Sequence, residues 1–286
     1  MAQRPDQAHE PSPDALEFRT VVCGVDDSPQ SAVVTDQAPQ LGAADARYWV
    51  VSAWDPSLAF NAGIHAGAVV GDLRDQAVSA LKRAAESRPG MESMLLKGRD
   101  VPALLAAISN LQADLVCVGS HGGSRAAGIL FGSVASAMSH HAPCSVLIAR
   151  EPPASEFPGT ILHANDGSPE SLRAARVAGE LAARHDATVV TVNVSEEGAK
   201  DVAEQAVVII ERSGREPRIV AEHGSPHRRL VEVADEVRAG LVVMGSRGQT
   251  GVAALGSVSE RVSHRAPCSV LIVRPPLHPI ADEGEW

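Results

Sequence analysis

Two glycine-rich segments have the residue types and spacing to bind an anion. The first carries Gly119, Gly122, Gly132 and Ser133 in the order G-x2-G-x9-G-S, directly after an apolar run. Glycine lets the backbone approach a ligand closely, and consecutive N–H groups can then point at one anion. Because Gly132 and Ser133 also open a predicted helix, free N–H groups and the helix dipole favour a phosphate there.

The second segment repeats this arrangement near the end of the chain. Gly245, Gly248, Gly256 and Ser257 have the order G-x2-G-x7-G-S, so this loop is two residues shorter. Neither segment is a Walker A loop, because the chain contains no GxxxxGK[ST] sequence. One loop alone is equally consistent with a helix cap without a ligand, whereas two copies of the whole layout favour a binding site.

An aspartate ends another predicted strand in each half of the chain. Asp26 follows CGV and Asp166 follows HAN. A carboxylate repels phosphate, so Asp26 suits a ribose hydroxyl, a metal ion that bridges to phosphate, or a loop N–H group. The alternative is that Asp26 and the nearby Ser28 cap the helix that follows. We favour capping for Ser28 and ligand contact for Asp26.

All of these residues belong to two copies of one unit. Three pairs of stretches match: 20–33 with 160–175, 113–122 with 239–248, and 140–150 with 264–274. The offset falls from 140 residues (20 to 160) to 124 residues (140 to 264), so the second copy lacks an internal segment.

Short β-branched runs alternate with helical patterns in both copies. We expect strands at 19–26, 47–54, 91–97, 114–119 and 144–150, and then at 159–165, 187–194, 216–222, 240–245 and 268–274. We expect helices at 29–44, 67–88, 101–112, 132–141, 169–185, 198–213, 226–238 and 256–265. This alternation predicts an α/β protein with two doubly wound parallel sheets. The strand order 3-2-1-4-5 would bring Asp26 and Gly119 to one crevice.

The domain organisation follows from the repeats. We expect a disordered tail at 1–17, domain one at 18–150, a linker at 151–158, domain two at 159–274 and a second tail at 275–286. The tails are Pro-rich or acidic, which is typical of disordered segments.

Composition excludes several classes of function. The net charge is −10, and with four Phe and one Tyr the chain offers neither a basic stripe nor stacking platforms for nucleic acid. Apolar runs are too short to cross a bilayer, and the N-terminus has no signal-peptide pattern, so we expect no membrane partner and a cytoplasmic protein. The four cysteines form no CxxC pair, so we expect buried, reduced thiols and no metal site.

Three motifs together resemble the universal stress protein family, in its tandem form and its ATP-binding subclass. They are CGVDDS and HANDGS at the ends of the first strands, the G-x2-G-x9-G-S loop, and the closing APCSVLI strands. The resemblance covers about 18–150 and 159–274. It implies Rossmann-like domains of the adenine nucleotide alpha hydrolase type, and it implies ATP, with Mg²⁺ as the accompanying metal.

The resemblance also implies the roles of site residues. Phosphate contacts fall on Gly119, Gly122, Gly132 and Ser133, Asp26 lies beside the nucleotide, and Ala53 lies near the adenine. The corresponding residues of copy two are Asp166, Val194, Gly245, Gly248, Gly256 and Ser257. The chain departs from the family pattern at Asp27, Ala53 and Asn165 and in the shorter second loop, so we expect copy one to be the better site.

The family pairs its domains edge to edge through the fifth strands, here CSVLIAR and CSVLIVR. We therefore expect this pairing within one chain, with further association into a homodimer. The implied function is an ATP-binding regulatory protein in stress or dormancy adaptation. Two alternatives remain at this point: a slow ATP hydrolase that uses His121 and Asp26, which we favour less, and an interaction scaffold without nucleotide.

Overall fold

The computed structural model describes residues 18–58, 66–122, 131–152, 157–194, 199–247 and 255–275. The elements of the first half are β1 (Thr20–Gly24), α1 (Gln30–Leu41), β2 (Arg47–Trp54), α2 (Ala66–Ser87), β3 (Glu92–Lys97), α3 (Asp100–Leu111), β4 (Leu115–Gly119), α4 (Ser133–His141) and β5 (Ser145–Ala149). Those of the second half are β6 (Thr160–Asn165), α5 (Pro169–His185), β7 (Thr188–Val194), α6 (Ala199–Glu211), β8 (Arg218–Glu222), α7 (Pro226–Glu236), β9 (Leu241–Gly245), α8 (Ser257–Arg265) and β10 (Ser269–Val273).

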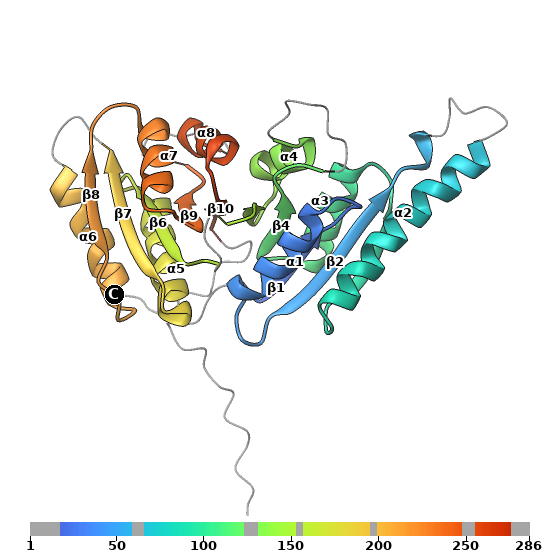
Figure 1. The fold of residues 1–286 in the computed structure, drawn as a ribbon, viewed down its shortest axis with the longest axis horizontal. Helices are drawn as coiled ribbons and strands as arrows, with labels where there is room; N and C mark the ends of the chain where they lie inside the picture. The colour runs from blue at the N-terminus through green and yellow to red at the C-terminus, as the bar shows by residue number, and fades with distance from the viewer. Residues whose placement is uncertain are drawn as a thin grey trace, which may run out of the picture.

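All the strands join one twisted ten-stranded sheet (Figure 1). Its order is β3-β2-β1-β4-β5-β10-β9-β6-β7-β8, so each half has the order 3-2-1-4-5. The pairs within each half are parallel. The predicted α/β class and strand order are therefore confirmed.

The two halves meet through β5 and β10, which pair antiparallel. Leu147 lies opposite Leu271, and these two leucines occupy the same position of the repeat, so a quasi-twofold axis passes between them. Both strands are fully buried, which removes the apolar edges that would invite aggregation. The predicted pairing of the domains within one chain is confirmed.

Two arginines at equivalent repeat positions, half-buried Arg150 and buried Arg274, form hydrogen bonds across this seam. Arg150 Nη1 donates to the carbonyl oxygen of Cys268 at 3.3 Å, and Arg274 Nη1 donates to that of Cys144 at 3.1 Å. Burial lowers the pKa of Arg150 to about 10 and also lowers that of Arg274. Each guanidinium thus ties the end of its own strand to the start of the opposite domain's fifth strand.

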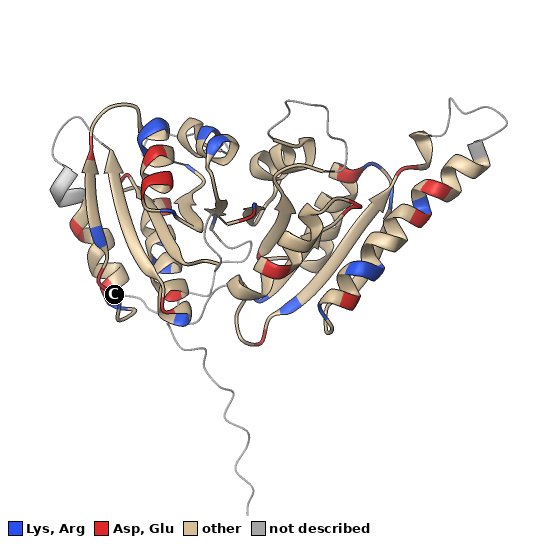
Figure 2. Ribbon diagram, in the orientation of Figure 1, with Lys and Arg blue, Asp and Glu red and all other residues tan. Residues whose placement is uncertain are grey.

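Helices cover both faces of the sheet. Buried residues of α1, α5 and α6 pack on one face, where α2 extends the cover over β2 and β3, and buried residues of α3, α4, α7 and α8 pack on the other. Charged residues lie on the helices, the loops and the outer strands β2, β3 and β8, whereas the central strands β4, β5, β9 and β10 carry none (Figure 2).

Three smaller expectations can be compared with the structure. The four cysteines are free and buried, as expected. Helix α1 ends at Leu41 and not at residue 44, because Gly42 takes an extended backbone conformation with ψ at 158°. Within the described ranges, the structure contains no helix that is both long and apolar enough to cross a bilayer.

Candidate functional site

Site one lies where the strand order of the first half reverses. β1 and β4 are neighbours there, with Cys23 opposite Cys117. The residues that follow each strand therefore meet at one edge of the sheet. A Cβ atom on Gly122 would lie 2.7 Å from Asp26 Oδ2, so the structure brings the predicted aspartate and the glycine loop together.

Two other glycines of this loop are equally close to their neighbours. A Cβ atom on Gly119 would lie 2.8 Å from the Cβ of Gln30, in the first turn of α1. The N–H of Gly132 donates to the carbonyl oxygen of Ser120 at 2.7 Å, and a Cβ there would lie 3.2 Å from His121 Cα. The loop therefore closes on itself, and a larger residue at any of these three glycines would have to displace a neighbouring group.

The first turn of α4 forms one wall of site one. Gly132 is the N-cap residue, and it has no side chain that could occupy the free N–H groups of the helix. Ser133 is the first helical residue and is exposed. The residues between the second and third glycines, 123–130, lie outside the described ranges. A helix start with open N–H groups beside a tight glycine loop is suited to an anion.

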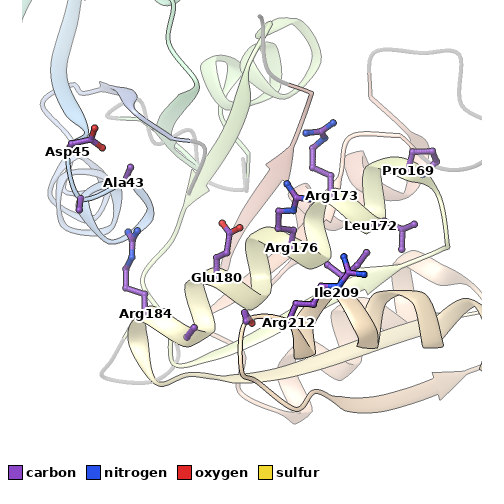
Figure 3. A pocket seen from close by; sticks show the side chains of 13 residues that line it. Ala43, Asp45, Pro169, Leu172, Arg173, Arg176, Glu180, Arg184, Ile209 and Arg212 are labelled. Carbon is purple, nitrogen blue, oxygen red and sulfur yellow. The ribbon is translucent and has the colours of Figure 1, made fainter. Parts of the chain in front are cut away.

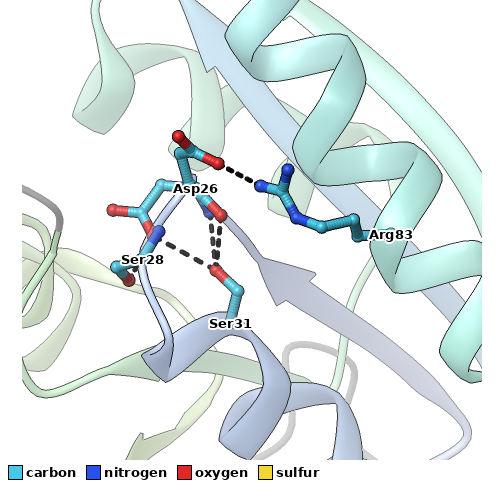
Figure 4. Close-up of polar contacts among 5 residues, drawn as sticks. Asp26, Ser28, Ser31 and Arg83 are labelled. Carbon is cyan, nitrogen blue, oxygen red and sulfur yellow. Dashed lines mark hydrogen bonds and ion pairs between the residues drawn. The ribbon is translucent and has the colours of Figure 1, made fainter.

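Hydroxyl groups hold the carboxylate of Asp26 in place (Figure 4). Its Oδ1 accepts hydrogen bonds from the Ser28 N–H at 3.0 Å, from the Ser28 hydroxyl and from the Ser31 hydroxyl at 3.1 Å. The expectation that Ser28 caps α1 is wrong, because its hydroxyl is taken by Asp26 and Pro29 is the N-cap residue. The adjacent Asp27 forms an exposed ion pair with Arg83 of α2.

Site one is acidic beyond these two aspartates. Burial raises the pKa of Asp100, at the start of α3, and the charges of Asp26 and Asp55 raise it further. No group of three or more His, Cys, Asp or Glu among the described residues is arranged to hold a metal ion. Ala53 lies at the carboxyl end of β2, two residues beyond Val51, whose carbonyl oxygen accepts the Val25 N–H.

Site two has the same backbone arrangement as site one. It lies at the opposite edge of the sheet because β5 and β10, which join the domains, run antiparallel. A Cβ atom on Gly245 would lie 2.7 Å from the Cβ of Glu170 in α5. The Gly256 N–H donates to the carbonyl oxygen of Ser246 at 2.7 Å, and Ser257 begins α8. Gly248, also predicted for this site, lies outside the described ranges.

The strand ends of site two are held by a polar network. Asp166 Oδ1 accepts the Ser168 N–H at 3.0 Å, while the Ser168 hydroxyl oxygen caps α5 by accepting the Ser171 N–H at 3.1 Å. Asn165 Oδ1 accepts the Gly167 N–H at 3.1 Å. Val194 ends β7 and is half-buried, which places it at the same edge of the sheet.

An ion pair distinguishes site two from site one. Arg247 of the second loop lies 3.4 Å from Glu170 of α5. At the equivalent positions site one has His121, whose Nδ1 is 3.0 Å from the Ser120 hydroxyl oxygen, and Gln30, whose Oε1 is buried without a hydrogen-bond partner. Sequence reasoning missed Gln30 and Glu170. Each stands two residues after the Asp-x-Ser motif that both copies of the repeat share.

The glycine loop of site one also ends next to the other domain. Phe131, directly before Gly132, stacks on His264 of α8 with ring centroids 4.0 Å apart. His264 lies in the last turn of the helix whose first residue is Ser257 of site two. A single helix of nine residues therefore begins at site two and ends against the loop of site one.

Fold and sites together define a class of protein: tandem doubly wound α/β domains, each with a glycine loop at its strand-order reversal. The family model "Universal stress protein family" matches residues 17–150 and 159–274. The chain belongs to the universal stress protein family.

Individual relatives support this assignment. Universal stress protein Rv2623 of Mycobacterium tuberculosis is 32% identical over 231 residues, which cover 71% of this chain and 75% of the relative. A universal stress protein structure from Archaeoglobus fulgidus matches with a TM-score of 0.71 at 23% identity, over 90% of this chain and 99% of that one. Since the identity is below 25%, this last match speaks only to the fold.

Proposed function

We propose that the chain is a nucleotide-binding regulatory stress protein, with ATP as its ligand and site one as the stronger of two sites. The observation that carries the proposal is the glycine loop of site one. A Cβ atom on Gly119 would clash with Gln30, one on Gly122 would meet the Asp26 carboxylate, and one on Gly132 would press on the His121 backbone. The open first turn of α4 follows directly. Such a loop presents backbone N–H groups at close range to phosphate oxygens.

The surroundings of the loop support a nucleotide and not a free anion. Asp26 is held by the Ser28 and Ser31 hydroxyl groups beside Gly122, where it suits a ribose hydroxyl. Ala53 and, in site two, Val194 leave an apolar strand end for the base. The acidic neighbours Asp27 and Asp100 favour a nucleotide whose phosphates carry Mg²⁺, because the cation offsets the repulsion.

Site one ranks above site two because of the charges beside each loop. In site two, Glu170 places a carboxylate beside the first glycine and engages the loop residue Arg247. A phosphate entering there must compete with Glu170 for Arg247. In site one the equivalent Gln30 is neutral, so no carboxylate stands beside the first glycine of that loop.

The test is equilibrium binding of ATP, with and without Mg²⁺, to paired glycine variants. We expect Gly122→Ala/Gly132→Ala to lose most of the binding, because its new methyl groups meet Asp26 and the His121 backbone. Gly248→Ala/Gly256→Ala should lose less. A larger loss from the second pair would reverse the ranking, and no binding to the unmodified chain would reject the proposal. Mass spectrometry of the purified protein identifies any nucleotide it retains.

A further inference from the structure

A groove with a net positive charge is lined by residues other than those of the two glycine loops. This groove of about 890 Å³ runs along α5, between the turn that precedes β2 in domain one and α6 in domain two (Figure 3). The charged residues that line it are Arg173, Arg176, Arg184, Arg212, Asp45 and Glu180. Four positive charges against two negative ones make the groove net positive in a chain whose net charge is −10.

The groove is a fixed part of the domain seam. At one end the Arg184 guanidinium donates to the carbonyl oxygen of Gly42, and His185 Nε2 lies 2.7 Å from that of Gln40. These contacts join the C-terminal ends of α1 and α5, so both walls are held in position. None of the ion pairs among the described residues involves Arg176 or Arg212, and both are exposed.

The shape of the groove suits an extended acidic segment more than a single phosphate. The side chains from Arg173 to Arg184 follow one side of α5, as Figure 3 shows. Eleven residues of helix span about 16 Å, which corresponds to about five residues of extended chain. Leu172 and Ile209 also line the groove and offer apolar contact between the charges.

We propose that this groove binds the chain's own acidic segment 276–286, PLHPIADEGEW. The segment carries Asp282, Glu283 and Glu285 without any Lys or Arg, and it adds apolar Leu277, Ile280 and Trp286. Its composition therefore complements both the arginines and the apolar residues of the groove.

The topology places the start of this segment at one end of the groove. β10, β9 and β6 are parallel, so Pro275, just after β10, lies at the same edge as Pro169, which begins α5 and lines the groove. Eleven extended residues reach up to about 36 Å, more than the length of α5, which is about 25 Å. Because the segment is tethered, its effective concentration is in the millimolar range, so weak contacts suffice to fill the groove.

The test uses the full chain with a nitroxide spin label on Gly284→Cys. The four native cysteines are buried, so the introduced thiol is labelled selectively. In about 0.02 M salt we expect an immobilised component in the spectrum, and about 0.5 M salt should remove it, since exposed charge pairs are screened. Arg176→Gln/Arg212→Gln should reduce the immobilised fraction at least twofold.

The matched control is Arg218→Gln/Arg228→Gln, which removes two exposed arginines of the same domain outside the groove. It should leave the spectrum unchanged. A label that is mobile in low salt in the unmodified chain, or equally immobilised in both double variants, would overturn the proposal. If the immobilised fraction falls on tenfold dilution, the segment binds in the groove of a second copy of the chain. That result would also overturn the proposal.

Discussion

The two glycine loops have the same backbone arrangement and differ in the charged side chains beside it. In both, the first glycine packs on the first turn of the first helix of its domain, and the third glycine donates its N–H to the carbonyl oxygen of the residue after the first glycine. Site one places neutral Gln30 at this contact, whereas site two places Glu170 there and pairs it with Arg247. The comparison shows that the repeat preserves backbone geometry while side chains at equivalent positions change what each site can accept.

The largest expected effect tests whether the two halves are equivalent at the seam. Leu147→Ala and Leu271→Ala should each lower the free energy of unfolding by about 2–5 kcal/mol, because both leucines are fully buried at equivalent positions. Chemical denaturation of the two variants measures this. If the two variants lose unfolding free energies that differ by more than about 2 kcal/mol, the quasi-twofold symmetry does not extend to packing energy.

The next effect concerns a position where the two cores differ. Domain two has His163 where domain one has Cys23, and burial lowers the pKa of His163 to about 4. The unfolded value is about 6.5, so the stability that depends on neutral His163 is fully present above pH 6.5. It is lost as the pH falls toward 4, by at most about 3 kcal/mol.

Replacing this residue tests the difference directly. His163→Cys installs the domain-one residue and should lose about 3 kcal/mol less stability than the unmodified chain between pH 7 and pH 4. Calorimetric unfolding at several pH values measures the two profiles. Parallel profiles would mean that His163 is not the group that sensitises domain two to acid.

A reciprocal exchange tests the charge difference between the sites. Gln30→Glu should weaken ATP binding at site one about tenfold, or about 1.4 kcal/mol, because a carboxylate then stands beside Gly119. Glu170→Gln should strengthen binding at site two by a similar factor, because Arg247 becomes available to phosphate. Calorimetric titration measures both, with Glu170→Gln examined in the Gly122→Ala/Gly132→Ala background. If ATP still binds but neither exchange changes its affinity, the charge argument is contradicted, whereas the proposal of ATP binding is not.

The smallest effect concerns Asp27, where domain two has Gly167. Arg83→Gln should weaken ATP binding at site one two- to threefold, because it leaves the Asp27 charge uncompensated, and exposed pairs contribute less than about 1 kcal/mol. Asp27→Gly should strengthen binding by a similar factor. If Asp27→Gly weakens binding, the aspartate contributes to the site through a bound cation.

Much of the fold was predictable from local patterns. The strands 47–54 and 114–119 and the helix 169–185 agree with β2, β4 and α5 within a residue. Apolar periodicity and the alternation of elements are short-range properties, so they survive in a single sequence. The resemblance to the family supplied the pairing of β5 with β10, and the two nearly identical apolar strands agreed with it.

Parts of the sites were not predictable. Ser28 was expected to cap α1, but its hydroxyl is bound to Asp26, whereas the equivalent Ser168 does cap α5. Both copies share the Asp-x-Ser-Pro motif, and both aspartates accept the serine N–H at 3.0 Å, so the motif alone does not distinguish the two serine hydroxyls. The stack of Phe131 on His264 likewise joins residues of different domains.

The sequence by itself determined the two repeated α/β units and the glycine loops, because these follow from periodicity, repetition and backbone requirements that act over a few residues. Only the tertiary structure decided which charges meet. Glu170 reaches Arg247, and the arginines of α5 face the turn around Asp45, because parallel strands and the antiparallel seam bring distant segments together. Such encounters depend on the positions of whole elements, which no local pattern encodes.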